Sequence, residues 1–272
     1  MKKLLTFTAI IGIFVLGFYF YFHNVGRIRA NVNEIFITSA DVPGPFDGMR
    51  IVQISDLLVR SENCLVLLEH VVETVNNLDP EVIVFTGNLF MSEGLQFENR
   101  VADLLSNLNA DLMLIAVLGY HDLPHEELVN NVLSEAEFEL LNNRSIEVFN
   151  HSSVGINVIG SAPINDRSTM DQLLDVHVRE DRFNLLLMSV PTFSTVAFEH
   201  PIHAQFSGHC LATQDASHPM APCFQFYNGT YQFADSFILH VSPGLARFHT
   251  IPGLFRQPSI DSFLLIRQSS DL

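Results

Sequence analysis

Short apolar runs that alternate with helical segments are the feature that most constrains the fold of this chain. Residues 49–55 form a continuous run of apolar and β-branched residues, which is typical of a strand buried on both faces. Residues 61–77 then carry apolar residues at helical spacing, and residues 82–86 form a second apolar strand. This order predicts a βαβ unit.

The same alternation continues along the chain. Helices are expected over residues 100–109 and 124–140. An edge strand is expected within residues 31–48, ahead of a Pro-Gly-Pro turn. Other strands are expected at residues 112–118, 146–149, 156–159, 185–188, 237–241 and 263–266. The expected fold class is α/β, a sandwich of two mixed β-sheets with helices outside.

The first residues differ from the rest. Residues 4–22 contain no charged residue and are long enough, as a helix, to cross roughly 28 Å of hydrocarbon. Lys2 and Lys3 precede them, while Arg27 and Arg29 follow and favour the opposite orientation. A cleaved signal peptide is the competing interpretation. We expect an N-terminal membrane anchor in residues 1–30, one globular domain in residues 31–272, and single-pass location in the cell membrane with the domain on the extracytoplasmic side.

The net charge and the cysteine content limit the classes of function that this chain can have. A net charge of -16 argues against nucleic-acid binding, because phosphate backbones are bound by Lys and Arg, which are scarce here. Cys64, Cys210 and Cys223 form no Cys-x-x-Cys pair and are interpreted as isolated thiols. If the domain lies outside the cytosol, Cys210 with Cys223 is the pair expected to form a disulfide.

Polar residues directly follow the expected strands. Asp56 follows the first buried strand, Asn88 follows the second, and His121 with Asp122 follows the third. Because the carboxyl ends of neighbouring strands converge on one crevice, we expect these side chains to lie close together. A His beside a carboxylate suits a general acid, and simple hydrogen bonding within the loop is the alternative.

Five segments in this order resemble the calcineurin-like metallophosphoesterases, most closely a small membrane-anchored bacterial branch. They are Ser55-Asp56-Leu57-Leu58, Thr86-Gly87-Asn88, Gly119-Tyr120-His121-Asp122, Leu187-Met188-Ser189-Val190-Pro191 and Ser207-Gly208-His209-Cys210-Leu211. The family has Asp-x-His, Gly-Asp, Gly-Asn-His-Asp, a lone His, and Gly-His-x-His at these places. The resemblance extends from about residue 46 to residue 266.

The resemblance implies a hydrolase with two divalent cations of manganese, zinc or iron, but most ligands are replaced. Asp56, Asn88 and His209 stand at residual metal-ligand positions, while the lost ligand positions hold Leu58, Tyr120, Ser189 and Leu211. Leu has no donor atom, and Asn88 is neutral where the family has the bridging Asp, so the charge that holds two cations together is missing. By the same resemblance, His121 and Asp122 form a vestigial general-acid pair.

These residues predict a pseudoenzyme with a degenerate metal site, no bound cofactor, and a binding role for a protein or a small phosphate-containing ligand. The alternative is an active metal-dependent phosphohydrolase acting on a phosphomonoester, a phosphodiester or a lipid-linked pyrophosphate. A further alternative is a relocated site for one metal ion formed by His200, His203, His209 and Asp56. The expected partners also include the membrane, through the N-terminal helix, and exclude nucleic acid.

Overall fold

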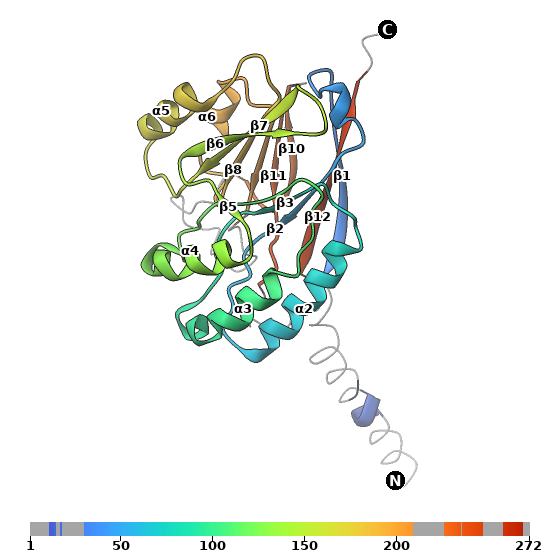
Figure 1. Ribbon diagram of the computed structural model, residues 1–272. Coiled ribbons are helices and arrows are strands. Elements are labelled where there is room, and N and C mark those ends of the chain that lie inside the picture. Colours follow the sequence, from blue (N-terminus) through green and yellow to red (C-terminus); the bar gives the residue numbers. More distant parts are fainter. Residues whose placement is uncertain are drawn as a thin grey trace.

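A computed structural model describes residues 11–14, 17, 30–208, 226–234, 236–246 and 258–268. Within them, two mixed six-stranded sheets pack face to face with helices on the outer faces (Figure 1). The first sheet has the order β1 (Asn31–Ser39), β12 (Ser259–Arg267), β2 (Arg50–Ile54), β3 (Val82–Phe85), β4 (Met113–Ala116) and β5 (Glu139–Leu140). The second has the order β10 (Gly229–Phe233), β11 (Phe237–Val241), β9 (Ala204–Ser207), β8 (Asn184–Met188), β7 (Gly155–Ser161) and β6 (Arg144–Phe149).

The predicted βαβ unit is confirmed. Strands β2, β3 and β4 are parallel neighbours. Helix α2 (Glu62–Asn76) connects the first two, and α3 (Glu98–Leu105) connects the second pair. All four residues of β3 are buried, as the continuous apolar run predicted. This parallel arrangement brings the carboxyl ends of β2, β3 and β4 to one end of the first sheet.

Three apolar cores hold these layers together. One lies between the sheets, one between the first sheet and helices α2, α3 and α4 (Glu126–Glu135), and one between the second sheet and helices α5 (Arg167–His177) and α6 (Ser194–Phe198). Phe206 and Phe263 stack across the gap between the sheets with ring centroids 3.8 Å apart. Burying a side chain of this size contributes roughly 1.5–3 kcal/mol.

The helix expected over residues 124–140 is shorter in the structure. It opens with a 3-10 turn, η3 (Leu123–His125), and α4 ends at Glu135. Glu137 then adopts a left-handed conformation with φ of 61°, which stops the helix and turns the chain into β5. Two other 3-10 turns, η1 (Gly44–Phe46) and η2 (Ser92–Phe97), precede β2 and α3.

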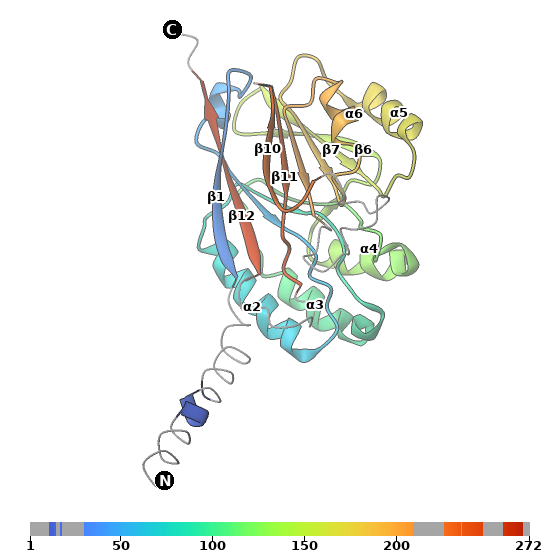
Figure 2. The ribbon, with the colours of Figure 1, turned by 180° about the vertical axis from the view of Figure 1, so that it is seen from behind.

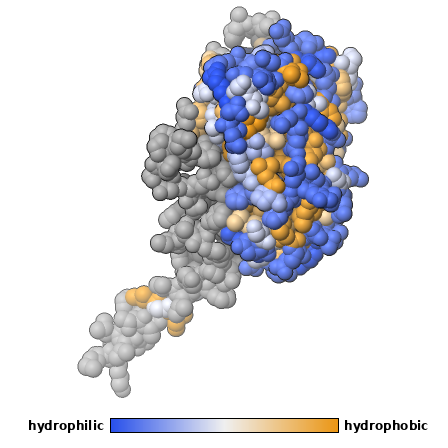
Figure 3. All heavy atoms as spheres, turned by 90° about the vertical axis from the view of Figure 1, so that its left-hand side faces the viewer, coloured by the Kyte–Doolittle hydropathy of each residue, from blue (hydrophilic) through white to orange (hydrophobic). Residues whose placement is uncertain are grey.

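The expected membrane segment needs correction. Most of residues 4–22 lie outside the described residues. In the part of the chain that the structure describes, no helix has the length and apolar character required to cross a bilayer, and this overturns the expected single-pass membrane location. On the face shown in Figure 3, hydrophilic residues surround smaller apolar patches, as on an ordinary protein surface.

The predicted Cys210–Cys223 pair lies outside the described residues as well. Cys64, on α2, is a half-buried free thiol. The prediction for the disulfide therefore stays a prediction.

Candidate active site

Two loops run side by side at the carboxyl ends of β2 and β3. The N–H of Asp56 donates to the carbonyl of Gly87 over 3.0 Å, and the N–H of Leu58 donates to the carbonyl of Asn88 over 3.0 Å. Asp56, Leu58 and Asn88 all have positive φ, at 53°, 42° and 65°. Such conformations are unfavourable for residues other than glycine and persist where the surroundings fix them. The ladder between the loops supplies that constraint and brings Asp56 and Asn88 together.

The side chain of Asn88 links three loops. Its Nδ2 donates to Oδ1 of Asp56 over 2.7 Å, and its Oδ1 accepts from the backbone N–H of His121 over 3.0 Å. The other carboxylate oxygen of Asp56 accepts from the hydroxyl of Ser55 over 2.8 Å. Asp56 and Asn88 are both fully buried. Both the nitrogen and the oxygen of the Asn88 amide are therefore used in hydrogen bonds inside the protein.

Asp122 fixes the loop after β4 to the loop after β3. Its Oδ2 accepts the N–H groups of Asn88, at 2.7 Å, and Gly119, at 2.8 Å, while its Oδ1 accepts the N–H of Leu89 at 2.7 Å. Burial raises the pKa of the Asp122 carboxyl above its ordinary value, although these three N–H groups and His121 act in the opposite direction. Both oxygens of Asp122 thus bind backbone groups and hold the loops in register.

Two glycines permit this close approach. A Cβ at Gly119 would lie 2.2 Å from Oδ1 of Asn88, and a Cβ at Gly208 would lie 2.6 Å from Oδ2 of Asp56. Neither distance is possible between real atoms, so any other residue would push the loops apart. Gly208 follows β9 and brings this end of the second sheet against Ser55 and Asp56.

The residues at lost ligand positions have other partners or none. Leu58 is 1% exposed, so its side chain is packed in the protein interior. The hydroxyl of Tyr120 lies 2.7 Å from Oδ1 of Asn165 and 3.1 Å from the carbonyl oxygen of Ile164, and it donates to these acceptors in the segment between β7 and α5. Burial raises the pKa of Tyr120. The hydroxyl of Ser189 is buried and has no hydrogen-bond partner within the described residues.

His209 and Leu211 lie outside the described residues. The relocated metal site is not assembled by the histidines that are described. Nε2 of His200 lies 3.5 Å from Asp171 on α5, and Nε2 of His203 lies 3.5 Å from Asp41. These two imidazoles therefore belong to separate surface contacts.

The described residues do not fit the pair of divalent cations that the fold implies. No group of three or more His, Cys, Asp or Glu side chains within them is arranged to hold a metal ion. Asn88 directs an N–H group at Asp56, whereas a bridging ligand would direct lone pairs at two cations. Leu58 offers no donor atom.

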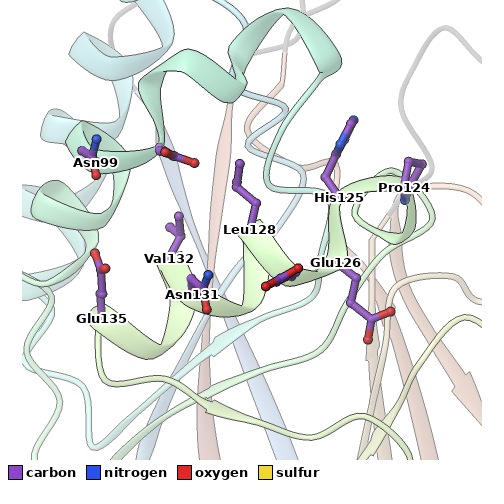
Figure 4. A pocket seen from close by; sticks show the side chains of 10 residues that line it. Asn99, Pro124, His125, Glu126, Leu128, Asn131, Val132 and Glu135 are labelled. Atoms are coloured by element: carbon purple, nitrogen blue, oxygen red, sulfur yellow. The ribbon is translucent and has the colours of Figure 1, made fainter.

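Sequence reasoning missed a groove between α3 and α4, about 460 Å³ in volume. Figure 4 shows side chains of both helices lining it. The lining includes Glu98, Glu126, Glu127 and Glu135, and it contains neither Lys nor Arg. A spacing pattern along one helix reveals only part of this surface, because Glu98 comes from the other helix. The groove disfavours phosphate groups.

A second missed feature is a buried polar network between the sheets. The carboxylate of Asp261 accepts hydrogen bonds from Ser242 at 2.5 Å, Asn33 at 2.8 Å and Ser259 at 2.9 Å. Nε2 of His240 lies 3.3 Å from the same carboxylate. Burial acts to raise the pKa of Asp261, but these donors outweigh it and hold the pKa below its ordinary value. The network joins β12 and β1 to β11.

Two mixed sheets packed face to face, with strand-end loops from both converging on a buried polar cluster, define a phosphoesterase-type α/β sandwich. The family model of the calcineurin-like phosphoesterases matches residues 49–209, and the chain belongs to this family. Over 263 residues it is 25% identical to the uncharacterized metallophosphoesterase YkuE of Bacillus subtilis, covering 92% of this chain and 90% of that protein. Membrane anchoring, which the apolar run of residues 4–22 had predicted, finds no support in the described residues.

Two more distant likenesses accompany this match. Over 75 residues the chain is 37% identical to the UDP-2,3-diacylglucosamine pyrophosphatase LpxG of Chlamydia muridarum, covering 28% of this chain and 23% of that protein. Among solved structures, it is similar to a dimetal phosphatase from Danio rerio with a TM-score of 0.46 and 9% identity, covering 73% of this chain and 88% of that chain.

Proposed function

We propose that this chain is a catalytically inactive member of the calcineurin-like phosphoesterase family with a binding role. The observation that carries the proposal is the side chain of Asn88, which joins Asp56 to the backbone of His121 by hydrogen bonds of 2.7 and 3.0 Å. In this arrangement the neutral Asn88 amide stands between Asp56 and the His121 backbone and is fully used in hydrogen bonds. It stabilises the loops without a cation.

Charge explains why this junction is a poor hydrolytic centre. Two dications about 3.5–4 Å apart need an anionic bridge to offset their repulsion. The amide of Asn88 carries no net charge, and a cation at Oδ1 of Asp56 would have to displace the bond from Nδ2. Without cations, His121 has no activated water to assist, because a general acid supplies only one part of the reaction.

The proposed binding role rests on the fixed strand-end loops and on the charge of the protein. The strand-end loops hold one defined geometry, and the protein is acidic, with a net charge of -16. Binding of nucleic acid is disfavoured by this charge. A protein partner is more compatible with the acidic surface than a phosphate-rich ligand is, because like charges repel.

A second candidate function is an active metal-dependent phosphohydrolase. Two observations favour it: the 75-residue match to a protein named as a pyrophosphatase, and the presence of Asp56, His121 and Asp122. The substrate would be a phosphomonoester, a phosphodiester or a pyrophosphate. Metal binding would then need His209, which lies outside the described residues.

Metal content separates these two functions. The full chain is incubated with manganese and zinc, freed of excess metal, and analysed by mass spectrometry, in parallel with hydrolysis assays on a phosphodiester and a pyrophosphate. We expect far less than one cation per chain and no hydrolysis above the metal-only blank. A pair of cations per chain together with turnover would refute the proposal in favour of the phosphohydrolase.

A matched variant locates the cause of inactivity. It combines Leu58→His, Asn88→Asp, Tyr120→Asn, Ser189→His and Leu211→His. We expect this variant to bind metal and to hydrolyse a phosphodiester, since the scaffold around the cleft belongs to the family. A folded variant that binds two cations but stays inactive would show that the rest of the cleft has also changed.

A further inference from the structure

The segment that follows β11 lies against the backbone of the loop after β2. The N–H of Leu245 donates to the carbonyl of Ser55 at 2.9 Å, and the N–H of Ala246 donates to the carbonyl of Asp56 at 2.7 Å. Figure 2 shows β11, which leads into this segment, next to β12 of the other sheet. The loop that carries Asp56 is thus held by residues 242–246 as well as by the loop after β3.

Gly244 brings this segment directly against the side chain of Asp56. A Cβ at Gly244 would lie 2.8 Å from Cβ of Asp56 and 3.0 Å from its Oδ2. Gly244 has a φ of 73°, a left-handed conformation that glycine adopts without strain, and it follows Pro243, whose fixed φ suits a turn at this place. Asp56 has a φ of 53°, which is uncommon for a residue other than glycine. Its conformation therefore depends on the neighbours that enclose it.

The carboxylate of Asp261 fixes Gly244 through two serines. Oδ2 of Asp261 accepts from the hydroxyl of Ser242 at 2.5 Å, and the same hydroxyl oxygen accepts from the N–H of Gly244 at 3.1 Å. Oδ1 of Asp261 accepts from the hydroxyl of Ser259 at 2.9 Å, and the backbone N–H of Ser259 donates to the carbonyl of Gly244 at 3.1 Å. Both backbone polar groups of Gly244 are therefore bound to residues that Asp261 holds.

Burial makes this arrangement rigid. Asp261 and Ser242 are 0% exposed, and Ser259 is 2% exposed. Hydrogen bonds to an ionised carboxylate are stronger than those between neutral groups, and the low dielectric of the interior strengthens them further. A different position of Ser242 would leave a buried anion with one donor fewer, which is unfavourable. The network therefore gives Gly244 one defined position.

We propose that Asp261 is a positioning residue of the candidate active site. By fixing Gly244, it sets the position of the side chain of Asp56. The carboxylate of Asp56 in turn accepts the hydrogen bond that joins the loop after β2 to the loop after β3. This role goes beyond the proposed function, because a binding site and an active metal site would both need Asp56 at this position.

One branch of the same network leads away from the site. Nδ2 of Asn33 donates to Oδ1 of Asp261 at 2.8 Å and to the hydroxyl oxygen of Ser259 at 2.7 Å. Asn33 lies on β1, and among the described residues its side chain makes no hydrogen bond to residues 242–246. Loss of this side chain should weaken the network without releasing Gly244. Asn33 therefore supplies a matched control.

Amide hydrogen exchange of the full chain tests whether the network holds the segment after β11. In Ser242→Ala, which removes the hydroxyl that links the network to Gly244, the N–H groups of Leu245 and Ala246 should exchange at least about tenfold faster. Rates are taken relative to the N–H groups of the buried strand β8, so that a global loss of stability cancels. Asn33→Ala should leave both relative rates within about twofold of those in the unmodified chain.

Nuclear magnetic resonance of the side-chain amide of Asn88 tests whether the segment positions Asp56. Because Nδ2 of Asn88 donates to Oδ1 of Asp56, the amide resonances report where that carboxylate lies. We expect these resonances to shift in Ser242→Ala and in Asp261→Asn but to stay unchanged in Asn33→Ala. A network that only stabilised the fold would lower stability in all three variants and leave the resonances of Asn88 in place.

The outcomes are distinct. Unchanged exchange in Ser242→Ala overturns the proposal, and so do equal changes in Asn33→Ala. Faster exchange without a shift of the Asn88 resonances also overturns it, because the segment would then move without the carboxylate. If circular dichroism shows that Asp261→Asn is misfolded, the comparison of Ser242→Ala with Asn33→Ala is sufficient. Binding of two cations by the unmodified chain would refute the proposed function and leave this result unaffected.

Discussion

The amide Nδ2 of Asn88 lies 2.7 Å from Oδ1 of Asp56, and this hydrogen bond joins the loop after β2 to the loop after β3. Both residues are fully buried. In the family pattern the same position carries an acid, so one exchange of oxygen for nitrogen turns a repulsive contact into an attractive one. The stability of the cleft therefore depends on the neutrality of Asn88.

Replacement of Asn88 by Asp should make folding depend on a cation. The variant places a second carboxylate against Asp56 in a buried site, and we expect the free energy of unfolding to fall by about 3–5 kcal/mol at neutral pH. Manganese should then raise the melting temperature of Asn88→Asp more than that of the unmodified chain, because a ligand of the folded state stabilises it. Thermal unfolding with and without manganese measures both effects.

Asn109→Asp is the control for this experiment. Asn109 is exposed, so a new charge there should change stability by less than about 0.5 kcal/mol. An Asn88→Asp variant as stable as the unmodified chain in metal-free buffer would contradict the role given to the amide.

Gly119→Ala should separate the loops at the cleft. The added Cβ would lie 2.2 Å from Oδ1 of Asn88 and 2.7 Å from its backbone nitrogen. We expect a loss of about 1–3 kcal/mol from this overpacking. Urea denaturation gives the value. Gly44→Ala is a milder comparison, since its Cβ would meet only the flexible end of Arg267 at 2.9 Å; equal losses in both variants would argue against a special role for Gly119.

Tyr120→Phe should weaken the link between the loop after β4 and the segment between β7 and α5. It removes the hydroxyl that bonds Ile164 and Asn165, at a cost of about 0.5–1.5 kcal/mol. A double-mutant cycle with Asn165→Ala, measured by urea denaturation, reports the coupling. Strictly additive losses would show that the 2.7 Å contact to Asn165 contributes nothing to stability.

The Asp261 network should give the protein an acid-sensitive contribution to stability. Because the pKa of Asp261 is lowered in the folded state, its contribution is complete above the unfolded value of about 3.9 and is lost as pH falls through the lower, folded value. The pH dependence that Asp122 contributes to stability has the opposite sign. Because the pKa of Asp122 is raised in the folded state, its protonation at falling pH favours the folded state.

Asp261→Asn isolates this contribution. At neutral pH we expect a loss of about 3–5 kcal/mol, because three hydrogen-bond donors and the neighbouring imidazole of His240 lose a buried anionic partner. The difference in unfolding free energy between Asp261→Asn and the unmodified chain should narrow as the pH falls towards the pKa that Asp261 has in the folded state. Urea midpoints measured across this acidic range test it; a gap that does not change with pH would contradict the assignment.

The sequence predicted most of the first sheet correctly. Its parallel strands appear as continuous apolar runs, and the connecting helix shows its own period, so both can be read from neighbouring residues. The predicted end of the helix over residues 124–140 was wrong, because α4 ends at Glu135. Hydrophobic spacing continues beyond Glu135, whereas the left-handed Glu137 and the pairing of β5 with β4 depend on contacts outside the segment.

By itself, the sequence determined the order of strands and helices from β1 to β4, the family, and the positions where polar residues follow strands, because each of these is encoded in local patterns. It did not predict β5, β9, β10, α5 or α6. Only the tertiary structure decided what those residues do. It placed the Asn88 amide between Asp56 and His121, turned the Tyr120 hydroxyl to Ile164 and Asn165, and joined Asn33 to Asp261, which are 228 positions apart. Such contacts depend on how strands distant in sequence pair and how two sheets pack, and no local pattern specifies a hydrogen-bond partner across that separation.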